Sequence, residues 1–434
     1  MSRIKNFDEI AISPARRAAL EIAEAALDAV DTRKTVKENI RFENGKLYIK
    51  NLSYSLEKTK KIAVVGIGKC AMEAASELEN ILGDHLYGGI VLDVYESYKC
   101  TLQKIECFIG THPLPSEKNI EATRKIVELL NALGEEDLVI FIISGGGSTL
   151  LCLPKGKAGC FDEKLIVVEL MRRGANISEI NTIRKHLSLA RGGYLAKYAY
   201  PAQVISLIFS DVPGNDIEFV ASGPTVKDTT TVSDTDTILA KYDILKSCGI
   251  EYCGLVETPK DGIYFKKVNN ILFMSNIIAL NAMKNKAREL EFSAKIVTDK
   301  LSGEAKDAGL MIAGDLEKSA NKTALLYGGE TVVTAKNGGN GGRNQELALS
   351  AMNSLRSGEI ILSINTDGWD NTDHAGALCD LLTKDKAVKL NINPQDFLDE
   401  HRSYDFFEKT GDYIETGRIS SNISDLVIAI KNNE

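Results

Sequence analysis

The sequence lacks the segments that would place the protein in a membrane or direct it for export. No apolar run approaches the roughly 20 residues that a bilayer-spanning helix needs. The first residues, MSRIKNFDEIAISPARR, lack the apolar core and the small-residue cleavage site of a signal peptide. With 44% hydrophobic and 26% charged residues, the composition is that of a water-soluble globular protein. We therefore expect a cytoplasmic protein with no membrane partner.

Three further features are absent from the sequence. There is no tract of basic residues, and a formal net charge of −8 argues against a nucleic-acid partner. The eight cysteines form no CxxC pair and no His/Cys cluster at the spacing of zinc ligands, so neither disulfides nor a structural metal are expected. No GxxxxGK[ST] string occurs, which excludes a P-loop as the nucleotide-binding element.

Apolar strands alternate with amphipathic helices through much of the chain. The strands KIAVVGIG, GGIVLDVY and DLVIFIIS are apolar almost throughout, and KCAMEAASELENIL and NIEATRKIVELLNAL have helical spacing. This alternation predicts a parallel sheet with helices on both faces. The N-terminal half is therefore predicted to be a doubly wound, mostly parallel α/β domain.

The length of 434 residues predicts more than one domain, because domains average ~100–200 residues. We expect two α/β domains, a Rossmann-like N-terminal domain at 1–240 and a C-terminal domain at 241–434. The boundary is placed in the polar, irregular region that follows Gly223. A first helix is predicted after Ser13-Pro14, and whether it packs on the N-terminal or the C-terminal domain is left open.

Glycine-rich loops follow six of the predicted strands, in the strings VVGIGKCA, ISGGGSTL, FSDVPGND, YGGET, GGNGGRNQE and NTDGWDNTDHAG. In doubly wound folds the ligand lies at the carboxyl ends of the strands, where glycine lets a phosphate approach backbone N–H groups. Any one of these loops can be explained as a turn. Six of them offer more phosphate-binding surface than a structural protein requires.

The first loop supports two hypotheses. GIGKCA, 66–71, fits GxGxxA after a strand, and Asp93 ends the next strand where a ribose-binding acid would lie, which favours a dinucleotide site. Lys69 argues against a dinucleotide, whose pyrophosphate packs against bare backbone at this turn. A lysine offers its charge to a transferring phosphoryl group instead. A solvated surface lysine is disfavoured because a cation opposes the helix dipole there.

Two further segments contain candidate substrate-binding or phosphate-binding residues. The second glycine loop could present several N–H donors and two hydroxyls to one anion, from Ser144, Gly145, Gly146, Gly147 and Ser148. A following helix carries Asn181, Arg184 and Lys185 on one face, which suits a carboxylate substrate, although a short basic run is usually a solvated face. His186 is interpreted as a packed or capping histidine.

The stretch YGGETVVTAKNGGNGGRNQELALS places Arg343 at a glycine-lined helix entrance, where its guanidinium could hold an anion bidentately. The glycines are expected to give that anion access. Glu330, Asn344 and Glu346 are further candidate binding residues around this entrance.

Acidic residues also follow strand-like segments. Phosphoryl transfer uses magnesium held by one or two carboxylates and by phosphate oxygens, although aspartate also favours turns on its own account. Asp211 is the first candidate for a catalytic metal ligand because it follows the apolar strand QVISLIFS, and Asp367 is the second.

Several of these strings, in this order, closely resemble the glycerate 2-kinase family, whose C-terminal region is the MOFRL domain: GKCAMEAA, GTHPLPSE, ISGGGSTLL, INTIRKHLSLARGG, SDVPGNDIEFVASGPTVKD, GGETVV, GGRNQELALS and TDGWDNTDHAGAL. The resemblance implies phosphorylation of D-glycerate by ATP and Mg²⁺ to 2-phosphoglycerate, in a cleft between two α/β domains. Lys69 and Arg343 match the family's proposed catalytic lysine and arginine. Assembly into a homodimer is left open.

Two segments depart from the family pattern. Thr416 to Leu426 reads TGRISSNISDL where the family usually has TGPTGTNV, and Trp369 and His374 stand where smaller residues are common. Phosphorylation of a related hydroxy acid therefore remains a second hypothesis. Two hypotheses from different functional classes also stay open, an NAD(P)-dependent dehydrogenase of a small hydroxy acid and a non-catalytic sensor of a phosphorylated metabolite.

Overall fold

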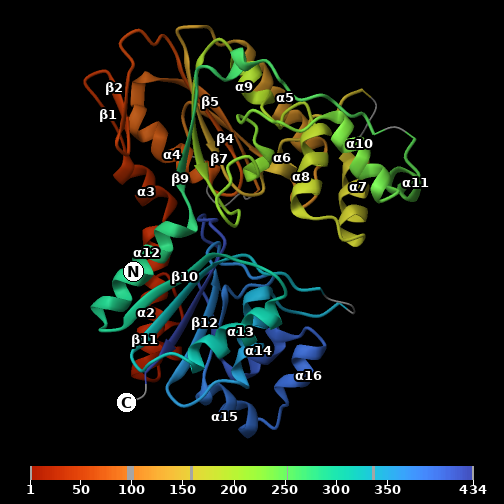
Figure 1. Cartoon of the computed structure of the whole chain (residues 1–434). Coiled ribbons are helices and arrows are strands. Elements are labelled where there is room, and N and C mark those ends of the chain that lie inside the picture. The colour runs from red at the N-terminus through yellow and green to blue at the C-terminus, as the bar shows by residue number, and fades with distance from the viewer. Residues whose placement is uncertain (1, 95–101, 157–159, 252, 335–337, 433–434) are drawn as a thin grey trace. The chain divides into compact units, whose positions relative to one another are not determined.

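The structure is a computed structural model that describes residues 2–94, 102–156, 160–251, 253–334 and 338–432 (Figure 1). The chain forms two compact units. Unit 1 consists of Met1–Asp31, Asp211–Asn215 and Met274–Glu434, and unit 2 consists of Thr32–Ser210 and Asp216–Phe273.

The expected boundary near residue 240 lies inside unit 2, because one more strand, β9 (Val268–Met274), is added to the N-terminal sheet. The periodicity of a strand does not reveal which sheet it joins.

Unit 2 contains a six-stranded sheet in the order β6-β5-β4-β7-β8-β9. Its first five strands along the chain are β4 (Ile62–Ile67), β5 (Leu86–Asp93), β6 (Ile105–Ile109), β7 (Leu138–Ile143) and β8 (Gln203–Phe209). These five strands pair in parallel, which confirms the predicted parallel sheet. The strand order reverses between β4 and β7, and doubly wound folds bind ligands beyond the carboxyl ends of the strands at this point.

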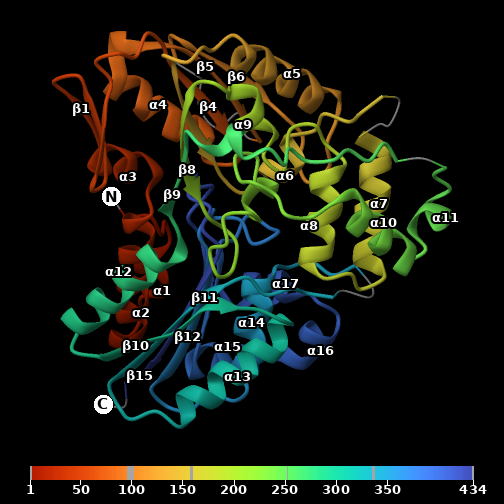
Figure 2. The same ribbon diagram turned by 45° about the horizontal axis from the view of Figure 1, so that its top comes forward.

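Helices cover both faces of this sheet, with α4 (Ala71–Leu82) and α5 (Glu117–Asn131) on opposite sides (Figures 1 and 2). A separate hydrophobic core joins α7 (Cys160–Arg172), α8 (Ile177–His186), α10 (Val232–Lys241) and α11 (Ile244–Cys248). The other α-helices and strands described in unit 2 are α3 (Thr32–Asn39), α6 (Gly147–Leu150), α9 (Tyr194–Ala199), and the antiparallel strands β1 (Ile40–Glu43), β2 (Lys46–Ile49) and β3 (Leu52–Ser55).

Unit 1 contains a mixed six-stranded sheet in the order β10-β11-β15-β12-β13-β14. The strands are β10 (Ser293–Leu301), β11 (Thr323–Gly329), β12 (Glu359–Asn365), β13 (Gly376–Cys379), β14 (Tyr413–Ile414) and β15 (Asp425–Lys431). Strand β15 runs antiparallel to both β11 and β12, so its first residue, Asp425, pairs with Gly329 and Asn365 at their carboxyl ends. This register places an acidic side chain where two neighbouring strands end.

The helices of unit 1 are α1 (Phe7–Ile10), α2 (Pro14–Ala29), α12 (Asn276–Glu289), α13 (Ala305–Glu317), α14 (Arg343–Met352), α15 (Leu381–Lys389), α16 (Pro394–Asp399) and α17 (Ser403–Thr410). Helix α14 is buried along its whole length after Arg343, and its apolar side chains join a core with α13 and with strands β11, β12 and β15.

Helix α2 begins where the sequence predicts it and packs on unit 1. Its N-cap Ser13 accepts a hydrogen bond from the backbone N–H of Arg16. The Arg16 side chain is fully buried and donates from Nε and Nη2 to Asp380, at 2.8 and 2.6 Å, and from Nη1 to Asp412 at 2.6 Å. These contacts tie the first helix to the C-terminal half of the chain.

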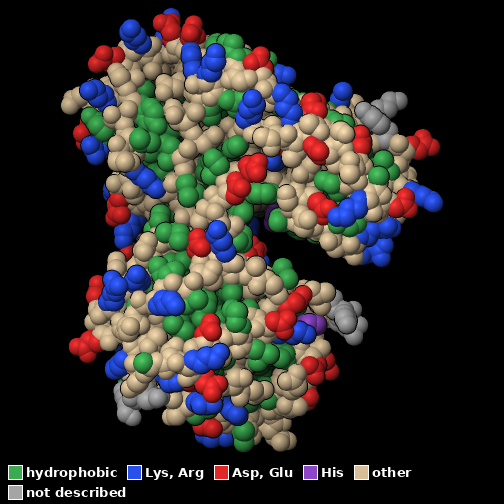
Figure 3. All heavy atoms as spheres, in the orientation of Figure 1, with side chains coloured by type: hydrophobic (Ala, Val, Ile, Leu, Met, Phe, Trp, Pro, Cys, Tyr) green, Lys and Arg blue, Asp and Glu red, His purple; other side chains and the backbone are tan. Residues whose placement is uncertain are grey.

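Three general expectations can be compared with the structure. No helix among the described residues is long and apolar enough to cross a membrane. On the face shown in Figure 3, positive and negative side chains are interspersed over most of the surface. The expectation of no disulfides was wrong, because Cys107 is disulfide-bonded. Cysteine spacing does not report which strand ends and loops lie side by side.

We predict that Arg16→Met lowers the free energy of unfolding of unit 1 by about 3–5 kcal/mol, because it leaves Asp380 and Asp412 buried without their arginine. Urea denaturation followed by circular dichroism measures this loss. Arg17→Ala is the matched control, since the Arg17 side chain is 51% exposed and lies 3.7 Å from an exposed Asp8. Equal effects of the two substitutions would contradict the anchoring role of Arg16.

Candidate active site

The loops that follow β4 and β7 are locked to each other at the reversal point of the unit 2 sheet. The backbone N–H of Lys69 donates to the carbonyl of Gly145 at 3.1 Å, and the Ser144 hydroxyl donates to the carbonyl of Ile67 at 3.2 Å. Gly68 has φ +113°, and a Cβ there would lie 2.2 Å from Ser144 Oγ. Ser144 was expected to bind substrate. Its side chain is instead fully buried and holds the two loops together through the hydrogen bond to Ile67.

Lys69 lies on this pair of loops. A Cβ built on Gly146 would lie 3.5 Å from Lys69 Cγ and 3.4 Å from His112 Cδ2, so the lysine side chain and the histidine ring both border this glycine. Gly146 has φ +82°, and Gly147 packs so closely that a Cβ would lie 2.5 Å from the Cβ of Ala221. The glycines thus let Lys69 and His112 lie against the β7 loop.

A chain of hydrogen bonds connects this loop with α8. The hydroxyls of Ser148 and Ser222 are 2.9 Å apart, and Ser222 donates to Asn181 Oδ1 at 2.7 Å. Because Ser222 has one proton to donate, Ser148 must donate to Ser222, which leaves Ser148 Oγ as an acceptor. Asn181 and Ser148 therefore belong to one polar network.

The backbone beside this network is strained. Ala221 and Ser222 have φ of 51° and 59°, a conformation that is typical of functional sites.

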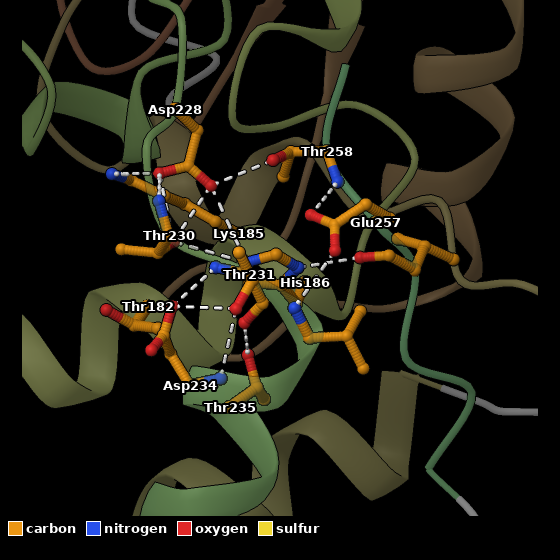
Figure 4. Close-up of polar contacts among 12 residues, drawn as sticks. Thr182, Lys185, His186, Asp228, Thr230, Thr231, Asp234, Thr235, Glu257 and Thr258 are labelled. Atoms are coloured by element: carbon orange, nitrogen blue, oxygen red, sulfur yellow. Dashed lines mark hydrogen bonds and ion pairs between the residues drawn. The ribbon is translucent and has the colours of Figure 1, made fainter. Parts of the chain in front are cut away.

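Lys185 and His186 point into the interior of unit 2, where the carboxylate of Asp228 accepts several hydrogen bonds (Figure 4). Lys185 Nζ lies 3.1 Å from Asp228 Oδ1, and Thr258 Oγ1 donates to Asp228 Oδ2 at 2.9 Å. Burial would raise the pKa of Asp228, but Lys185 and the Thr230 hydrogen bonds outweigh it and lower the pKa.

The charge of Lys185 is thus balanced inside the protein, and it also reaches Glu218 at 3.2 Å. His186 is a packed histidine, as expected, with Nδ1 2.7 Å from the carbonyl of Val256. Asp228 was not singled out from the sequence, where it is one of many Asp residues in polar loops.

Arg184 differs from its neighbour Lys185. Its side chain is partly buried, and no hydrogen bond or ion pair joins it to another described residue. Burial lowers its pKa and Arg191 lowers it further, against the opposing effect of Glu163. Glu163 is already bound to Arg191, at 2.7 and 3.1 Å. The guanidinium of Arg184 lies on the same face of α8 as Asn181, and it can therefore bind an anionic group.

In unit 1, Arg343 is the first residue of α14 and lies where β11 and β12 end. Its Nε and Nη2 donate to the two oxygens of Asp425 at 2.5 and 3.0 Å, and its Nη1 lies 2.6 Å from Glu330 Oε1. Burial would lower the pKa of Arg343, but Asp425 and then Glu330 outweigh it and raise the pKa. The sequence predicted that the guanidinium would bind an incoming anion through two parallel hydrogen bonds. In the structure it makes these two hydrogen bonds with the carboxylate of Asp425.

The glycines before Arg343 also accommodate groups of the protein. Asp370 accepts hydrogen bonds from the backbone N–H groups of Asn344 and Gln345, at 3.1 and 2.9 Å, and so caps α14. A Cβ on Gly342 would lie 2.1 Å from Asp370 Cγ. This differs from the expected opening for a phosphate, because the carboxylate of Asp370 fills the same space.

Two further residues of α14, expected to bind substrate, are engaged internally. Asn344 Nδ2 donates to Asp370 at 3.1 Å, and its Oδ1 accepts from Ser363 at 2.6 Å. Glu346 Oε2 lies 3.0 Å from His401 Nδ1. Both side chains are buried and support the helix.

The two candidate metal ligands lie on loops that contact the same segment, 416–425. Asn422 Nδ2 donates to Asp211 Oδ2 at 3.0 Å, and the backbone N–H of Ile419 donates to the carbonyl of Asp367 at 2.9 Å. No group of three or more His, Cys, Asp or Glu side chains among the described residues could hold a metal. Magnesium is commonly held by one or two carboxylates together with phosphate oxygens, so a role for Asp211 or Asp367 in holding it stays a prediction.

The departures from the family pattern meet in unit 1. The guanidinium of Arg418 lies 4.1 Å from the ring centroid of Trp369, a cation–π contact between the two altered segments. His374 stacks on Tyr413 with ring centroids 4.0 Å apart. Each of these contacts joins an altered residue to a neighbour within unit 1.

The first turn of α4 bears on the dinucleotide hypothesis. Asp93 is buried, and its Oδ2 accepts a hydrogen bond from the backbone N–H of Met72 at 3.0 Å. A carboxylate therefore lies where the pyrophosphate of a dinucleotide would bind. The acid expected for ribose recognition instead caps a helix.

Comparisons with known proteins place the chain among characterised sequences. Residues 18–251 match the family profile described as Domain of unknown function (DUF4147), and residues 323–425 match the MOFRL family. Glycerate 2-kinase of Pyrococcus horikoshii is 37% identical, with 96% of this chain and 97% of that protein covered. D-glycerate 2-kinase of Thermotoga maritima is 35% identical, with 96% and 98% covered.

A crystal structure of glycerate kinase from Thermotoga maritima has a TM-score of 0.82 at 33% identity, with 96% of this chain and 99% of that chain covered. A relative from Agrobacterium vitis bears a different name, putative hydroxypyruvate reductase, and is 37% identical over 84% of this chain and 86% of its own length.

The buried cap of α14 generates a pH prediction. Burial, and then Asp425, raise the pKa of Asp370 from 3.8 to about 6. The folded protein therefore holds this proton at pH values where the unfolded chain has released it, so the contribution to stability falls as pH rises through about 6. Between pH 3.8 and about pH 6, the free energy of unfolding of the wild type should therefore fall by roughly 3 kcal/mol relative to that of Asp370→Asn.

Urea denaturation at a series of pH values measures this difference. Asp385→Asn, which removes an exposed carboxylate from the same unit, serves as the control. A stability difference between wild type and Asp370→Asn that does not change with pH would contradict the prediction.

Proposed function

The chain belongs to the glycerate kinase family that carries the MOFRL domain, and from this membership we propose that it uses ATP to phosphorylate D-glycerate to 2-phosphoglycerate. The observation that carries the proposal is the position of Lys69 on the locked loops at the sheet reversal, beside Gly146 and His112. A cation carried by this fixed backbone is suited to stabilise charge on a phosphoryl group during transfer.

The unit 2 network offers contacts for the acceptor acid. The guanidinium of Arg184 presents a planar fork that matches a carboxylate. Ser148 Oγ, left as an acceptor by its hydrogen bond to Ser222, suits a substrate hydroxyl. We assign Lys185 a structural role in holding α8 in place, since Asp228 already balances its charge.

Unit 1 contributes Arg343 and the candidate metal ligands. Arg343 would stabilise phosphate charge in the same turnover as Lys69. Mg²⁺ bound with ATP would neutralise phosphate charge, and Asp211 and Asp367 are the carboxylates that would hold it.

A dehydrogenase is the second candidate, favoured by the name of the Agrobacterium vitis relative. The capping role of Asp93 argues against it, because a buried carboxylate at the start of α4 would repel a pyrophosphate. The same GIGKCA loop thus supports the kinase better than the dehydrogenase.

The activity prediction separates these candidates. Purified full-length protein incubated with ATP, Mg²⁺ and D-glycerate should release ADP, and ³¹P NMR should identify the product as the 2-phosphate. NADH oxidation with hydroxypyruvate, in the absence of any ATP turnover, would overturn the kinase proposal. A 3-phosphate product would overturn the assigned regiochemistry.

The role of Lys69 is tested by Lys69→Met, which keeps much of the side-chain volume and removes the charge. We expect kcat to fall by roughly 10²–10³-fold, as for loss of one stabilising donor. Lys61→Met is the matched control, because Lys61 immediately precedes the amino end of the same strand, β4. Similar kcat values for the two variants would remove Lys69 from the mechanism.

Arg184→Lys keeps the charge and loses the planar fork. If Arg184 holds the acceptor carboxylate, KM for glycerate should rise by about tenfold with little change in KM for ATP. A rise in KM for ATP alone would assign Arg184 to the nucleotide instead.

A further inference from the structure

A chain of hydrogen bonds in unit 2 ends at a hydroxyl that a ligand can reach. Ser148 Oγ lies 2.9 Å from Ser222 Oγ, and Ser222 donates to Asn181 Oδ1 at 2.7 Å. Ser222 is fully buried and Asn181 is 5% exposed, whereas Ser148 is partly exposed. Ser148 stands two residues after Gly146, the glycine that borders Lys69. A ligand bound at this loop therefore meets the chain of hydrogen bonds at Ser148.

The carbonyl of Glu218 sets the direction of these hydrogen bonds. A carbonyl only accepts, and its oxygen lies 3.4 Å from Asn181 Nδ2, so the amide of Asn181 turns its own oxygen toward Ser222. The single hydroxyl proton of Ser222 goes to that oxygen, and the proton of Ser148 goes to Ser222. Ser148 Oγ therefore offers a ligand an acceptor and not a donor.

The backbone holds Ser222 in the position that this direction requires. Its N–H donates to the carbonyl of Phe219 at 3.2 Å, and its carbonyl accepts from the N–H of Gly192 at 2.9 Å. The preceding residue, Ala221, packs on Gly147, where a Cβ would lie 2.5 Å from the Cβ of Ala221. Ala221 and Ser222 both have positive φ, a conformation that costs free energy in residues other than glycine. The fold thus keeps Ser222 beside the β7 loop at an energetic cost.

A hydroxy acid and the corresponding keto acid differ at the atom that would contact Ser148. A hydroxyl can donate to Ser148 Oγ while every hydrogen bond of the chain stays in place. A keto oxygen only accepts, so it would need the proton of Ser148, and Ser222 Oγ would then lose its donor. One hydrogen bond of this kind corresponds to roughly tenfold in affinity, so the chain favours the hydroxy acid.

We propose that Ser148 is a specificity-determining residue that accepts a hydrogen bond from the C2 hydroxyl of the acceptor acid, and that Asn181 and Ser222 are positioning residues that fix the direction of its hydroxyl. The site then binds a 2-hydroxy acid more tightly than the 2-keto acid of the same carbon skeleton. The placement of the acceptor acid at Ser148 rests on the proposed function, whereas the direction of the hydrogen bonds does not.

The test compares D-glycerate with hydroxypyruvate, which has a carbonyl in place of the C2 hydroxyl and is otherwise the same acid. Isothermal titration calorimetry of the full-length chain, without ATP, measures both dissociation constants. The wild type should bind D-glycerate about tenfold more tightly than hydroxypyruvate. Ser148→Ala should weaken the binding of D-glycerate by about tenfold and leave that of hydroxypyruvate unchanged.

Ser222→Ala should change the preference through the other acid. The hydroxyl of Ser148 then has no acceptor at residue 222, so it can donate to a keto oxygen as well as accept from a hydroxyl. Binding of hydroxypyruvate should become about tenfold tighter, and binding of D-glycerate should stay within about threefold of the wild type. Damage to the fold would instead weaken the binding of both acids.

Two substitutions of Asn181 separate hydrogen bonding from packing. Asn181→Asp keeps an acceptor for Ser222, so the ratio of the two dissociation constants should stay at its wild-type value, although the added charge weakens the binding of both acids. Asn181→Leu has no acceptor, so the preference for D-glycerate should be lost. Ser178→Ala is the matched control, because Ser178 is exposed on the same helix, α8, and its ratio should equal that of the wild type.

Equal binding of the two acids by the wild type would overturn the proposal, as would failure to bind either acid. A preference that survives in both Ser222→Ala and Asn181→Leu would also overturn it. If Ser222→Ala does not fold, the two Asn181 variants decide the direction of the hydrogen bonds. The predicted preference without ADP release would refute the proposed function alone, and ADP release without the preference would refute this proposal alone.

Discussion

The hydrogen bond from the Lys69 N–H to the Gly145 carbonyl fixes the part of the molecule on which the functional account depends. It joins the ends of the two central strands, β4 and β7, at the point where the sheet order reverses. Ser144 and Gly68 strengthen the junction through a contact too close for any side chain at Gly68. Because both loops are held by the sheet, the lysine side chain starts from a fixed backbone position.

Carboxylates of the protein occupy many of the other places where an anion could bind. Asp93 caps α4, Asp370 caps α14, Asp228 balances Lys185, and Asp425 binds the fork of Arg343. Each satisfies donors that would otherwise attract phosphate without selectivity. A donor or cation that is balanced in this way does not attract a substrate phosphate by its charge alone.

The sequence predicted the parallel sheet of unit 2 because its strands are continuously apolar, and it predicted the loop that carries Lys69. It did not predict the boundary of the units, because β9 joins the sheet after a long irregular segment. The placement of α2 depends on Arg16 and on Asp380, 364 residues away, a contact with no local signal.

The candidate site was predictable to a similar extent. Glycines before Arg343 and the lysine beside Arg184 were interpreted as ligand-binding features, but Asp370 and Asp228 fill those roles from distant segments. A buried carboxylate and a bound phosphate require the same glycines and the same cations. Sequence patterns therefore locate anion sites without telling whether the anion belongs to the protein.

The most direct test of the account is a double-mutant cycle on kcat with Lys69→Met and Arg343→Lys. Catalytic groups that act together on one transition state are strongly non-additive. If both cations stabilise the same phosphoryl transfer, the double variant should be little slower than the slower single variant. Effects that multiply in full would show that the two residues act independently, and would contradict the account.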